Sequence, residues 1–381
     1  MAIQKLTIEE FLKLAKQYPV LDVRSPGEYS HAQIPGAYNL PLFTDEERKS
    51  VGTTYKQQSR EAAIKAGLDY FGVKMKKMVE EAESLIVGRR PLTEKELQAN
   101  NEQRTSANVV LIHCWRGGMR SAGVAWLLDL YGFKVYTLVG GYKAYRKWVL
   151  AQFEKEYNFK IVGGYTGSGK TNVLHELLKQ NKTIIDLEDL AIHKGSAFGS
   201  IAGKPQPKQE MFENLLAQAL VDTGYKMQDM NDNDPGPGIP DPASCIWLED
   251  ESQRIGNLQI PMPLWYTMRR SPVFFLDIPF EERLAYITEE YGKIEKERLA
   301  ESILRIQKRL GGLDTKNAIN FLEEGKLNDC FRILLNYYDK WYRKGLNNRE
   351  NLASLLNKIP CMGVDTKTNV QKLLSCQTVS T

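Results

Sequence analysis

Short apolar runs alternate with amphipathic stretches through the first 150 residues of the chain. Residues 18–23, 108–113 and 135–138 are rich in Val, Leu and Ile and have the length of buried strands. Residues 121–131 place apolar side chains at helical spacing. This alternation predicts a parallel sheet with helices on its faces. The long, charged stretch 45–104 between the first two runs is helical in its spacing, and we interpret it as an insertion.

The second half of the chain begins with the same pattern. An apolar run at 160–163 meets a glycine turn and then an amphipathic stretch. Further strand-like runs lie at residues 183–187, 244–248 and 273–278. Residues 229–243 (DMNDNDPGPGIPDPA) are acidic and rich in Pro and Gly, which predicts a loop or lid. From residue 280 apolar positions recur every three or four residues almost to the end of the chain, and this predicts helices.

These patterns together predict an α/β protein with two parallel-sheet units and a helical end. We expect a first parallel-sheet domain over residues 1–150, a second α/β domain over 151–280 and a helical C-terminal region over 281–381. A chain of 381 residues has the length of two or three ordinary domains.

Composition narrows the class of protein. No apolar run approaches the roughly 18 residues that a membrane helix needs, and residues 1–16 lack the apolar core of a signal peptide. The five cysteines are far apart and odd in number, which argues against a disulfide framework and a Cys-rich zinc site. We therefore expect a cytoplasmic protein with no membrane segment. The net charge of +4 permits a nucleic-acid or phosphate ligand without requiring one.

A cysteine stands where the second apolar run should pass into a helix. Cys114 lies in the sequence HCWRGGMRS, which also contains Arg116 and Arg120. Backbone N–H groups in such a turn point inward, the helix N-terminus adds partial positive charge, and the arginines add full charges. These features favour the Cys114 thiolate and a bound anionic group, so we predict all three residues as catalytic. A merely buried, apolar cysteine would not need this setting.

Two chemistries share such a loop, because Cys-x5-Arg also fits the cysteine-dependent phosphatases. The segments LDVRSPGEY at 21–29 and IPGAYNLP at 34–41 decide between them, since they resemble the rhodanese-like sulfurtransferase domain. In that domain the cysteine carries sulfur or selenium as a persulfide-type intermediate. The resemblance departs at Ala32-Gln33, where rhodaneses commonly have Gly-His, and we expect this change to affect only loop packing.

A phosphate-binding motif opens the second α/β unit. Residues 164–171 read GYTGSGKT, which matches G-x-x-x-x-G-K-[ST] between a strand-like run and a helical one. The glycines let backbone N–H groups wrap a diphosphate, the lysine neutralises it, and the threonine hydroxyl is placed for Mg²⁺. The motif does not say which phosphate ester binds or whether a nucleotide is hydrolysed. The predicted phosphate-binding residues are Gly164, Gly167, Ser168, Gly169, Lys170 and Thr171.

Acidic residues at the ends of later strands are candidates for completing this site. One of them should order Mg²⁺ or a water, as carboxylates do in other phosphate-loop proteins. The candidates are Asp186, Glu188 and Asp189 after one strand, Glu249, Asp250 and Glu251 after another, and Asp277 after a third, and we single out Asp186, Glu249 and Asp250 as possible ligands. Solvated charge at a strand end is the alternative for each of them. We predict no tightly bound cofactor and assign no set of metal ligands.

Aromatic and basic residues interleave at two places that are candidates for RNA contact. Bases of single-stranded RNA stack on aromatic rings while Lys and Arg hold phosphates, which selects Tyr337, Tyr338 and Arg343. Aromatic residues at helical spacing also form ordinary cores, and this alternative stays open. Lys143 and Arg146, in the basic stretch that precedes the second unit, are further candidates.

The combination of the two motifs is specific. The chain resembles the tRNA 2-selenouridine synthase family over about residues 21–343, through both loops and the segments NLPLFTDEER, VGTTYKQ, GGYK, GSAFG, LEDESQRIG and YYD. Departures from the family pattern are the 229–243 loop and Lys340-Trp341.

The resemblance implies a two-step conversion of wobble 2-thiouridine, with tRNA, geranyl diphosphate and selenophosphate as substrates. Geranyl diphosphate first alkylates the sulfur, and selenophosphate then supplies selenium as the geranylated sulfur leaves. The resemblance also implies that Cys114 carries the selenium as a selanylcysteine. A phosphate loop suits the first step, because it can stabilise departing diphosphate.

Three other functions remain open at this level. A cysteine phosphatase would need an aspartate general acid on a mobile loop, and no residue stands out for that role. A phosphate-loop kinase or ATPase would tolerate loss of Cys114, and an RNA-binding adaptor would tolerate loss of both loops. The sequence leaves open the set of tRNAs, the oligomeric state, the position of the geranyl chain and the domain that binds selenophosphate.

Overall fold

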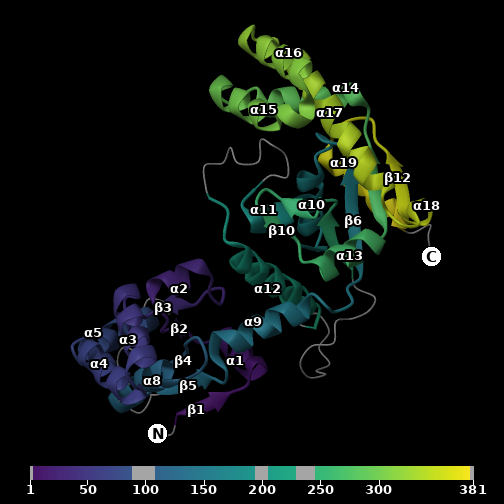
Figure 1. Ribbon diagram of the computed structural model, residues 1–381. Helices are drawn as coiled ribbons and strands as arrows, with labels where there is room; N and C mark the ends of the chain where they lie inside the picture. The colour runs from purple at the N-terminus through teal and green to yellow at the C-terminus, as the bar shows by residue number, and fades with distance from the viewer. Residues whose placement is uncertain (1–2, 88–107, 194–204, 229–244, 378–381) are drawn as a thin grey trace. The chain divides into compact units, whose positions relative to one another are not determined.

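The computed structural model describes residues 3–87, 108–193, 205–228 and 245–377, and the fold is stated for these residues. The chain divides into two compact units, Met1–Ala151 and Gln152–Thr381, and each is described by itself (Figure 1). The predicted loop at 229–243 lies outside the described residues. None of the helices in the described part of the chain combines the length and apolarity needed to cross a bilayer.

Five parallel strands form the sheet of the first unit, in the order β1-β5-β4-β2-β3. All five residues of the central strand β4 are buried, as expected for a Val- and Ile-rich run between two parallel neighbours. The edge strands β1 and β3 are too short to produce an apolar run in the sequence. The strands are β1 (Gln4–Leu6), β2 (Val20–Asp22), β3 (Tyr38–Asn39), β4 (Val109–His113) and β5 (Lys134–Leu138).

The helices of the first unit complete one core with the sheet. Phe71, Met78 and Ala82 belong to the same apolar cluster as Val110 and Leu128. The stretch interpreted as an insertion is helical in its described part, and since its side chains complete this core, it is the crossover between β3 and β4. The helices are α1 (Ile8–Ala15), α2 (Pro26–His31), α3 (Asp45–Gln57), α4 (Arg60–Gly72), α5 (Met75–Val87), α8 (Met119–Tyr131) and α9 (Gly141–Gln152).

The second unit is built on another five-stranded parallel sheet, in the order β12-β11-β6-β8-β7. The strand that enters the phosphate motif, β6, lies at the centre. Ligands of open α/β sheets bind at the carboxyl ends of the strands, where this order places the motif. The strands are β6 (Phe159–Gly164), β7 (Thr183–Ile184), β8 (Ile246–Glu249), β11 (Val273–Asp277) and β12 (Leu356–Pro360), with a small antiparallel pair β9 (Arg254–Ile255) and β10 (Leu258–Gln259).

The predicted helical C-terminal region is confirmed, with one strand added to it. Helices α14 to α17 pack around a core of their own (Figure 1). The chain then returns to the sheet as β12, which pairs with β11. The apolar pattern did not predict β12, because only Ile359 of this strand is buried. The helices are α10 (Lys170–Lys179), α11 (Leu187–Ala191), α12 (Gln209–Gln228), α13 (Met262–Arg270), α14 (Phe280–Tyr291), α15 (Lys296–Leu310), α16 (Gly312–Glu323), α17 (Leu327–Asn347), α18 (Leu352–Leu355) and α19 (Thr366–Gln377).

Candidate functional site

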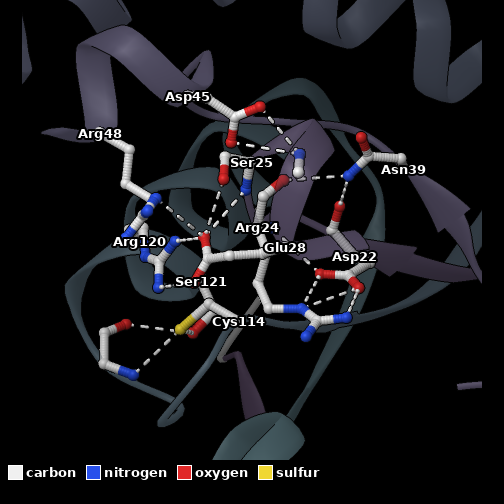
Figure 2. Close-up of polar contacts among 12 residues, drawn as sticks. Asp22, Arg24, Ser25, Glu28, Asn39, Asp45, Arg48, Cys114, Arg120 and Ser121 are labelled. Carbon is white, nitrogen blue, oxygen red and sulfur yellow. Dashed lines mark hydrogen bonds and ion pairs between the residues drawn. The ribbon is translucent and has the colours of Figure 1, made fainter. Parts of the chain in front are cut away.

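The cysteine loop lies at the carboxyl end of β4. Cys114 is 3% exposed, and its Sγ lies 3.3 Å from the backbone nitrogen of Gly118 and 3.2 Å from Oγ of Ser121 (Figure 2). Helix α8 begins at Met119, so the sulfur lies near a helix N-terminus, where unpaired N–H groups favour negative charge. The geometry is that of a cradle for an anionic sulfur.

The contacts of the sulfur lower the pKa of Cys114. Burial raises that pKa, but the Ser121 hydroxyl and the backbone N–H groups of Ser121, Arg116 and Gly118 lower it by more. Oγ of Ser121 also lies 3.0 Å from the Gly118 carbonyl oxygen, and the hydroxyl has only one proton to donate. The hydroxyl can therefore donate to that carbonyl beside a thiol and turn to the sulfur beside a thiolate. The thiolate is the reactive form of cysteine.

The GGYK segment at residues 140–143 packs against the backbone of the cysteine loop. The N–H groups of Tyr142 and Lys143 donate to the carbonyl oxygens of Cys114 (2.8 Å) and Trp115 (3.0 Å). Gly141 has a φ of +58°, and a Cβ atom there would lie 2.3 Å from the Cys114 oxygen. Only glycine permits two backbones to approach so closely. The sequence indicated this GGYK segment through a family resemblance and, at Lys143, as a candidate RNA contact, and the structure shows that it also holds the cysteine loop in place.

The guanidinium group of Arg120 pairs with Glu28. Its Nη1 lies 2.7 Å from Oε2 of Glu28, which also accepts the Ser25 hydroxyl at 3.1 Å and has Nε of Arg48 at 3.6 Å (Figure 2). Burial raises the pKa of Glu28, but the hydrogen bond and charge of Arg120, together with the Ser25 N–H and the charge of Arg48, lower it by more. Arg116 is exposed, and its backbone N–H is the group that acts on the sulfur. Of the two predicted arginines, Arg116 therefore contacts the sulfur through its backbone, whereas the side chain of Arg120 pairs with the Glu28 carboxylate.

A buried ion pair from the LDVR segment supports the same region. Nη2 of Arg24 lies 2.6 Å from Oδ2 of Asp22, and both side chains are almost fully buried (Figure 2). The Arg24 guanidinium also lies over the ring of Tyr142, 3.7 Å from its centroid. Since Tyr142 donates to the Cys114 carbonyl, the pair steadies the segment behind the sulfur.

The phosphate motif forms the turn between β6 and α10. Gly164, Gly167 and Gly169 have φ angles of +152°, +80° and +69°, which residues with side chains rarely adopt. Lys170 is the first residue of α10, and its Nζ donates to the Gly164 carbonyl at 3.1 Å. Ser168 is buried. A turn of this kind at a helix N-terminus is an anion site.

Three glutamates gather beside the phosphate motif. One carboxylate oxygen from each of Glu188, Glu249 and Glu251 lies within 4.8 Å of the others, and the Thr171 hydroxyl lies 3.4 Å from Oε2 of Glu188. Burial, followed by the charge of Glu188, raises the pKa of Glu249 to about 8. Oε1 of Glu249 is buried without a hydrogen-bond partner. Such a set of oxygen ligands fits a divalent cation such as Mg²⁺, which would offset the repulsion between the carboxylates.

Of the three acidic residues singled out for this role, Glu249 belongs to the group and the other two are engaged elsewhere. Asp186 caps α11 and pairs with His175 at 2.7 Å. Asp250 forms a buried ion pair with Arg349 at 2.8 Å. Neighbouring side chains at a strand end point to opposite faces, so the acidic run itself did not show which members face the motif. The other two glutamates of the group, Glu188 and Glu251, come from the same acidic runs, whose pattern named them as candidates without singling them out.

A cavity of about 1040 Å³ opens at the phosphate motif within the second unit. The motif and the three glutamates line part of it, and aromatic side chains line much of the rest. These are Trp265, Tyr286, Tyr291, Tyr337, Tyr338, Trp341 and Tyr342. Such a surface suits an apolar or flat organic group attached to a phosphate.

The predicted RNA contacts fall in both units. Tyr337 and Tyr338 line the cavity, and Arg343 is exposed with its Nε 3.4 Å from the Tyr165 hydroxyl. In the first unit Lys143 is exposed and Arg146 is half-buried, both on α9.

Comparisons with known proteins find matches in both units of the chain. The model of the rhodanese-like domain matches residues 7–71, and the model of the tRNA 2-selenouridine synthase AAA domain matches residues 157–358. A tRNA 2-selenouridine synthase of Bdellovibrio bacteriovorus is 32% identical, covering 92% of this chain and 94% of its own. The chain belongs to the tRNA 2-selenouridine synthase family.

Other members of the synthase family are similarly related. The tRNA 2-selenouridine synthase of Pseudomonas putida is 35% identical over 77% of this chain and 76% of its own. That of Shewanella halifaxensis is 31% identical over 92% of this chain and 94% of its own. The rhodanese-like match ends before Cys114, and the structure continues the same parallel sheet through β4 and β5. The cysteine loop of this synthase family member therefore belongs to that sheet.

Proposed function

We propose that the protein converts 2-thiouridine at the wobble position of tRNA into 2-selenouridine through an S-geranylated intermediate. Geranyl diphosphate alkylates the sulfur first, and selenophosphate supplies selenium second. The main support is that one chain carries a cradle for a reactive sulfur and a phosphate-binding turn that opens into an aromatic cavity. The two steps need different environments, and the chain offers two.

The first step suits the phosphate motif of the second unit. The thiocarbonyl sulfur of the base forms a bond to C1 of the geranyl group while the bond from C1 to the diphosphate oxygen breaks, and N3 of the base loses its proton. The N–H groups of the turn and Lys170 stabilise the diphosphate as it leaves. Aromatic rings pack the apolar chain, and their faces favour the positive charge that develops on the allylic carbon.

The three glutamates would hold a divalent cation at this motif. Glu188, Glu249 and Glu251 supply carboxylate oxygens, and Thr171 supplies a hydroxyl on the same side. When bound, the cation would neutralise part of the diphosphate charge. The buried, unpartnered oxygen of Glu249 supports this assignment.

The second step suits the cysteine loop. The selenium of selenophosphate forms a bond to C2 of the base while the bond from C2 to the geranylated sulfur breaks, and that sulfur leaves with a proton as geranyl thiol, which is a better leaving group than sulfide. Water then cleaves the Se–P bond, phosphate leaves, and N3 of the base regains its proton, so that selenium keeps its oxidation state throughout. We assign this step to Cys114, as the residue that holds the selenium donor in place, because the N–H groups around its sulfur favour a negatively charged group there.

The macromolecular substrate in this proposal is tRNA. Tyr337 and Tyr338 would stack on an unpaired base at the cavity, and Arg343 would contact a phosphate. On α9, Lys143 and Arg146 would contact the tRNA backbone. Lys143→Glu combined with Arg146→Glu should weaken tRNA binding and flatten its salt dependence, whereas Lys5→Glu with Lys134→Glu, an equal charge change on exposed strand residues, should do so less.

Mass spectrometry of the nucleosides in thiolated tRNA treated with the purified protein tests the proposal. Geranyl diphosphate alone should give S-geranyl-2-thiouridine, and adding selenophosphate should give 2-selenouridine. Lys170→Ala should block both products, because it removes a full charge beside the diphosphate. Cys114→Ser should let the geranylated base accumulate. Formation of 2-selenouridine without geranyl diphosphate would contradict the mechanism, and ATP consumption in proportion to product would favour a kinase or ATPase.

A further inference from the structure

The carbonyl groups at the start of the phosphate motif are held by hydrogen-bond donors. Three successive residues are involved: Lys170 Nζ donates to Gly164 (3.1 Å), the Ser168 N–H to Tyr165 (3.1 Å) and Arg283 Nη1 to Thr166 (2.9 Å). A carbonyl oxygen that faced an anion would repel it. Because a trans peptide holds C=O and N–H on opposite sides, fixing these carbonyls also fixes the direction of the following N–H groups.

One of these donors is set in place by helix α17. Arg283 is 3% exposed, and its guanidinium makes two hydrogen bonds to Asp339 of α17, at 3.0 and 2.7 Å. Its Nε also donates to the Ile278 carbonyl at 3.2 Å. The buried guanidinium is thus held on two sides, and Nη1, which also donates to Asp339, reaches the Thr166 oxygen with its second N–H. Asp339 determines where that N–H points.

A second residue of α17 reaches the first glycine of the motif. The Tyr342 hydroxyl accepts the Gly164 N–H at 3.1 Å and donates to Oδ2 of Asp250 at 2.6 Å. Arg349 makes two hydrogen bonds to the same carboxylate, at 3.0 and 2.8 Å. The hydroxyl is therefore fixed between a charged acceptor and the backbone of the turn. Asp339 and Tyr342 are three residues apart and lie on one side of the helix.

We propose that Tyr342 and Asp339 are positioning residues that hold the phosphate motif in its binding geometry and thereby set its affinity for diphosphate. The inference rests on the proposed use of the motif for a diphosphate and not on the organic group that the diphosphate carries. The YYD segment of α17 then serves the site in two ways. Its two tyrosines line the cavity, whereas its aspartate supports the turn from behind.

Calorimetric titration of the full-length protein with inorganic diphosphate tests the inference. Tyr342→Phe keeps the ring and removes only the bridging hydroxyl, and it should weaken diphosphate binding about tenfold. Asp339→Asn should weaken binding by a similar factor, because Arg283 loses its charged partner. Tyr266→Phe changes a half-exposed tyrosine of α13 and is the matched control, with no expected loss. In assays of the alkylation step, Tyr342→Phe and Asp339→Asn should each raise KM for the diphosphate substrate more than they lower kcat.

Thermal unfolding of the same variants separates positioning from a general loss of stability. A Tyr342→Phe protein that melts close to the wild-type temperature and binds diphosphate as tightly as the wild type overturns the inference. If that variant does not fold, unchanged diphosphate affinity in Asp339→Asn overturns it instead. Wild-type protein that binds inorganic diphosphate but does not use geranyl diphosphate would refute the proposed first step and leave this inference standing. Failure of the wild type to bind diphosphate would refute both.

Discussion

The cysteine loop and the phosphate motif are both turns from a central parallel strand into a helix, yet we propose that their N–H groups serve different anions. In the first unit the N–H groups converge on Sγ of Cys114, an atom of the chain itself. In the second unit the carbonyls of the turn are occupied by donors, and Lys170 stands beside a large cavity. In our proposal the same backbone arrangement serves an internal anion in one unit and an external one in the other.

The supports behind the two turns also differ. Behind the cysteine loop the contact is between two backbones, at Gly141, where no side chain fits. Behind the phosphate motif the supports are side chains, Arg283 and Tyr342, which belong to helices far along the chain. A methyl group added at Gly141 would remove the backbone contact completely. Substitution of a supporting side chain can instead remove one hydrogen bond at a time. The predictions below test this difference.

Gly141→Ala should produce the largest effect. The added Cβ would lie 2.3 Å from the Cys114 oxygen and 2.5 Å from the Gly117 nitrogen, at a left-handed φ. We expect a loss of about 3 kcal/mol or more of unfolding free energy, measured by urea unfolding, and loss of 2-selenouridine formation. Gly36→Ala is the matched control, because Gly36 has a φ of +77° but open space around it, and it should cost only about 1 kcal/mol. Equal costs for the two variants would show that the backbone contact does not matter.

The local parts of both sites could be predicted from the sequence, because each turn is a contiguous segment. The strand, glycines and helix of residues 164–171 carry their own signal, and so do the residues around Cys114. The supports could not be predicted in this way. Tyr342 is 178 residues from the glycine that it contacts, and Arg349 is 99 residues from Asp250, so that no spacing rule connects them.

The same limit explains the other differences between expectation and structure. β12 has only one buried residue, so it lacks the apolar run by which strands are recognised. Asp186 and Glu188 are two residues apart at the end of β7, and the start of α11 between them turns the first into a cap and the second toward Thr171. The cap at Asp186, and not the number of acidic residues in the run, therefore decides which carboxylate faces the phosphate motif.

Ser121→Ala should have an intermediate effect, because it removes one of several donors to the sulfur. The Ser121 hydroxyl lowers the pKa of Cys114, and the backbone N–H groups remain in the variant. The pKa should therefore rise, and alkylation of Cys114 by iodoacetamide near neutral pH should slow roughly two- to tenfold, as expected for one hydrogen bond. Peptide mass spectrometry would follow the reaction at Cys114 alone. Ser84→Ala, at an exposed serine of α5, should leave the rate unchanged. An unaltered pH profile of the alkylation rate in Ser121→Ala would exclude the Ser121 hydroxyl as a donor to the thiolate.

The smallest effect is expected at the glutamate group, where pH and a divalent cation act on the same residue. The pKa of Glu249 is raised from 4.5 to about 8 by burial and by the charge of Glu188. Between these two pH values the folded protein keeps a proton that the unfolded chain releases, so this residue lowers the unfolding free energy as pH rises. Above about pH 8 the folded carboxyl is ionised as well, and the dependence ends.

Mg²⁺ should therefore raise the melting temperature by a few degrees, and more above about pH 8 than near pH 5, because it competes with the proton for the Glu249 carboxylate. Glu249→Gln removes both the titrating group and a ligand, so the variant should lose most of the Mg²⁺ effect and part of the pH dependence. Glu290→Gln is the matched control, because Glu290 lines the same cavity but lies outside the three-glutamate group. Calorimetric melting curves with and without Mg²⁺ would give both quantities. An equal Mg²⁺ effect at the two pH values, or in Glu249→Gln, would remove the cation from this group and leave the phosphate motif to bind its anion through the backbone and Lys170.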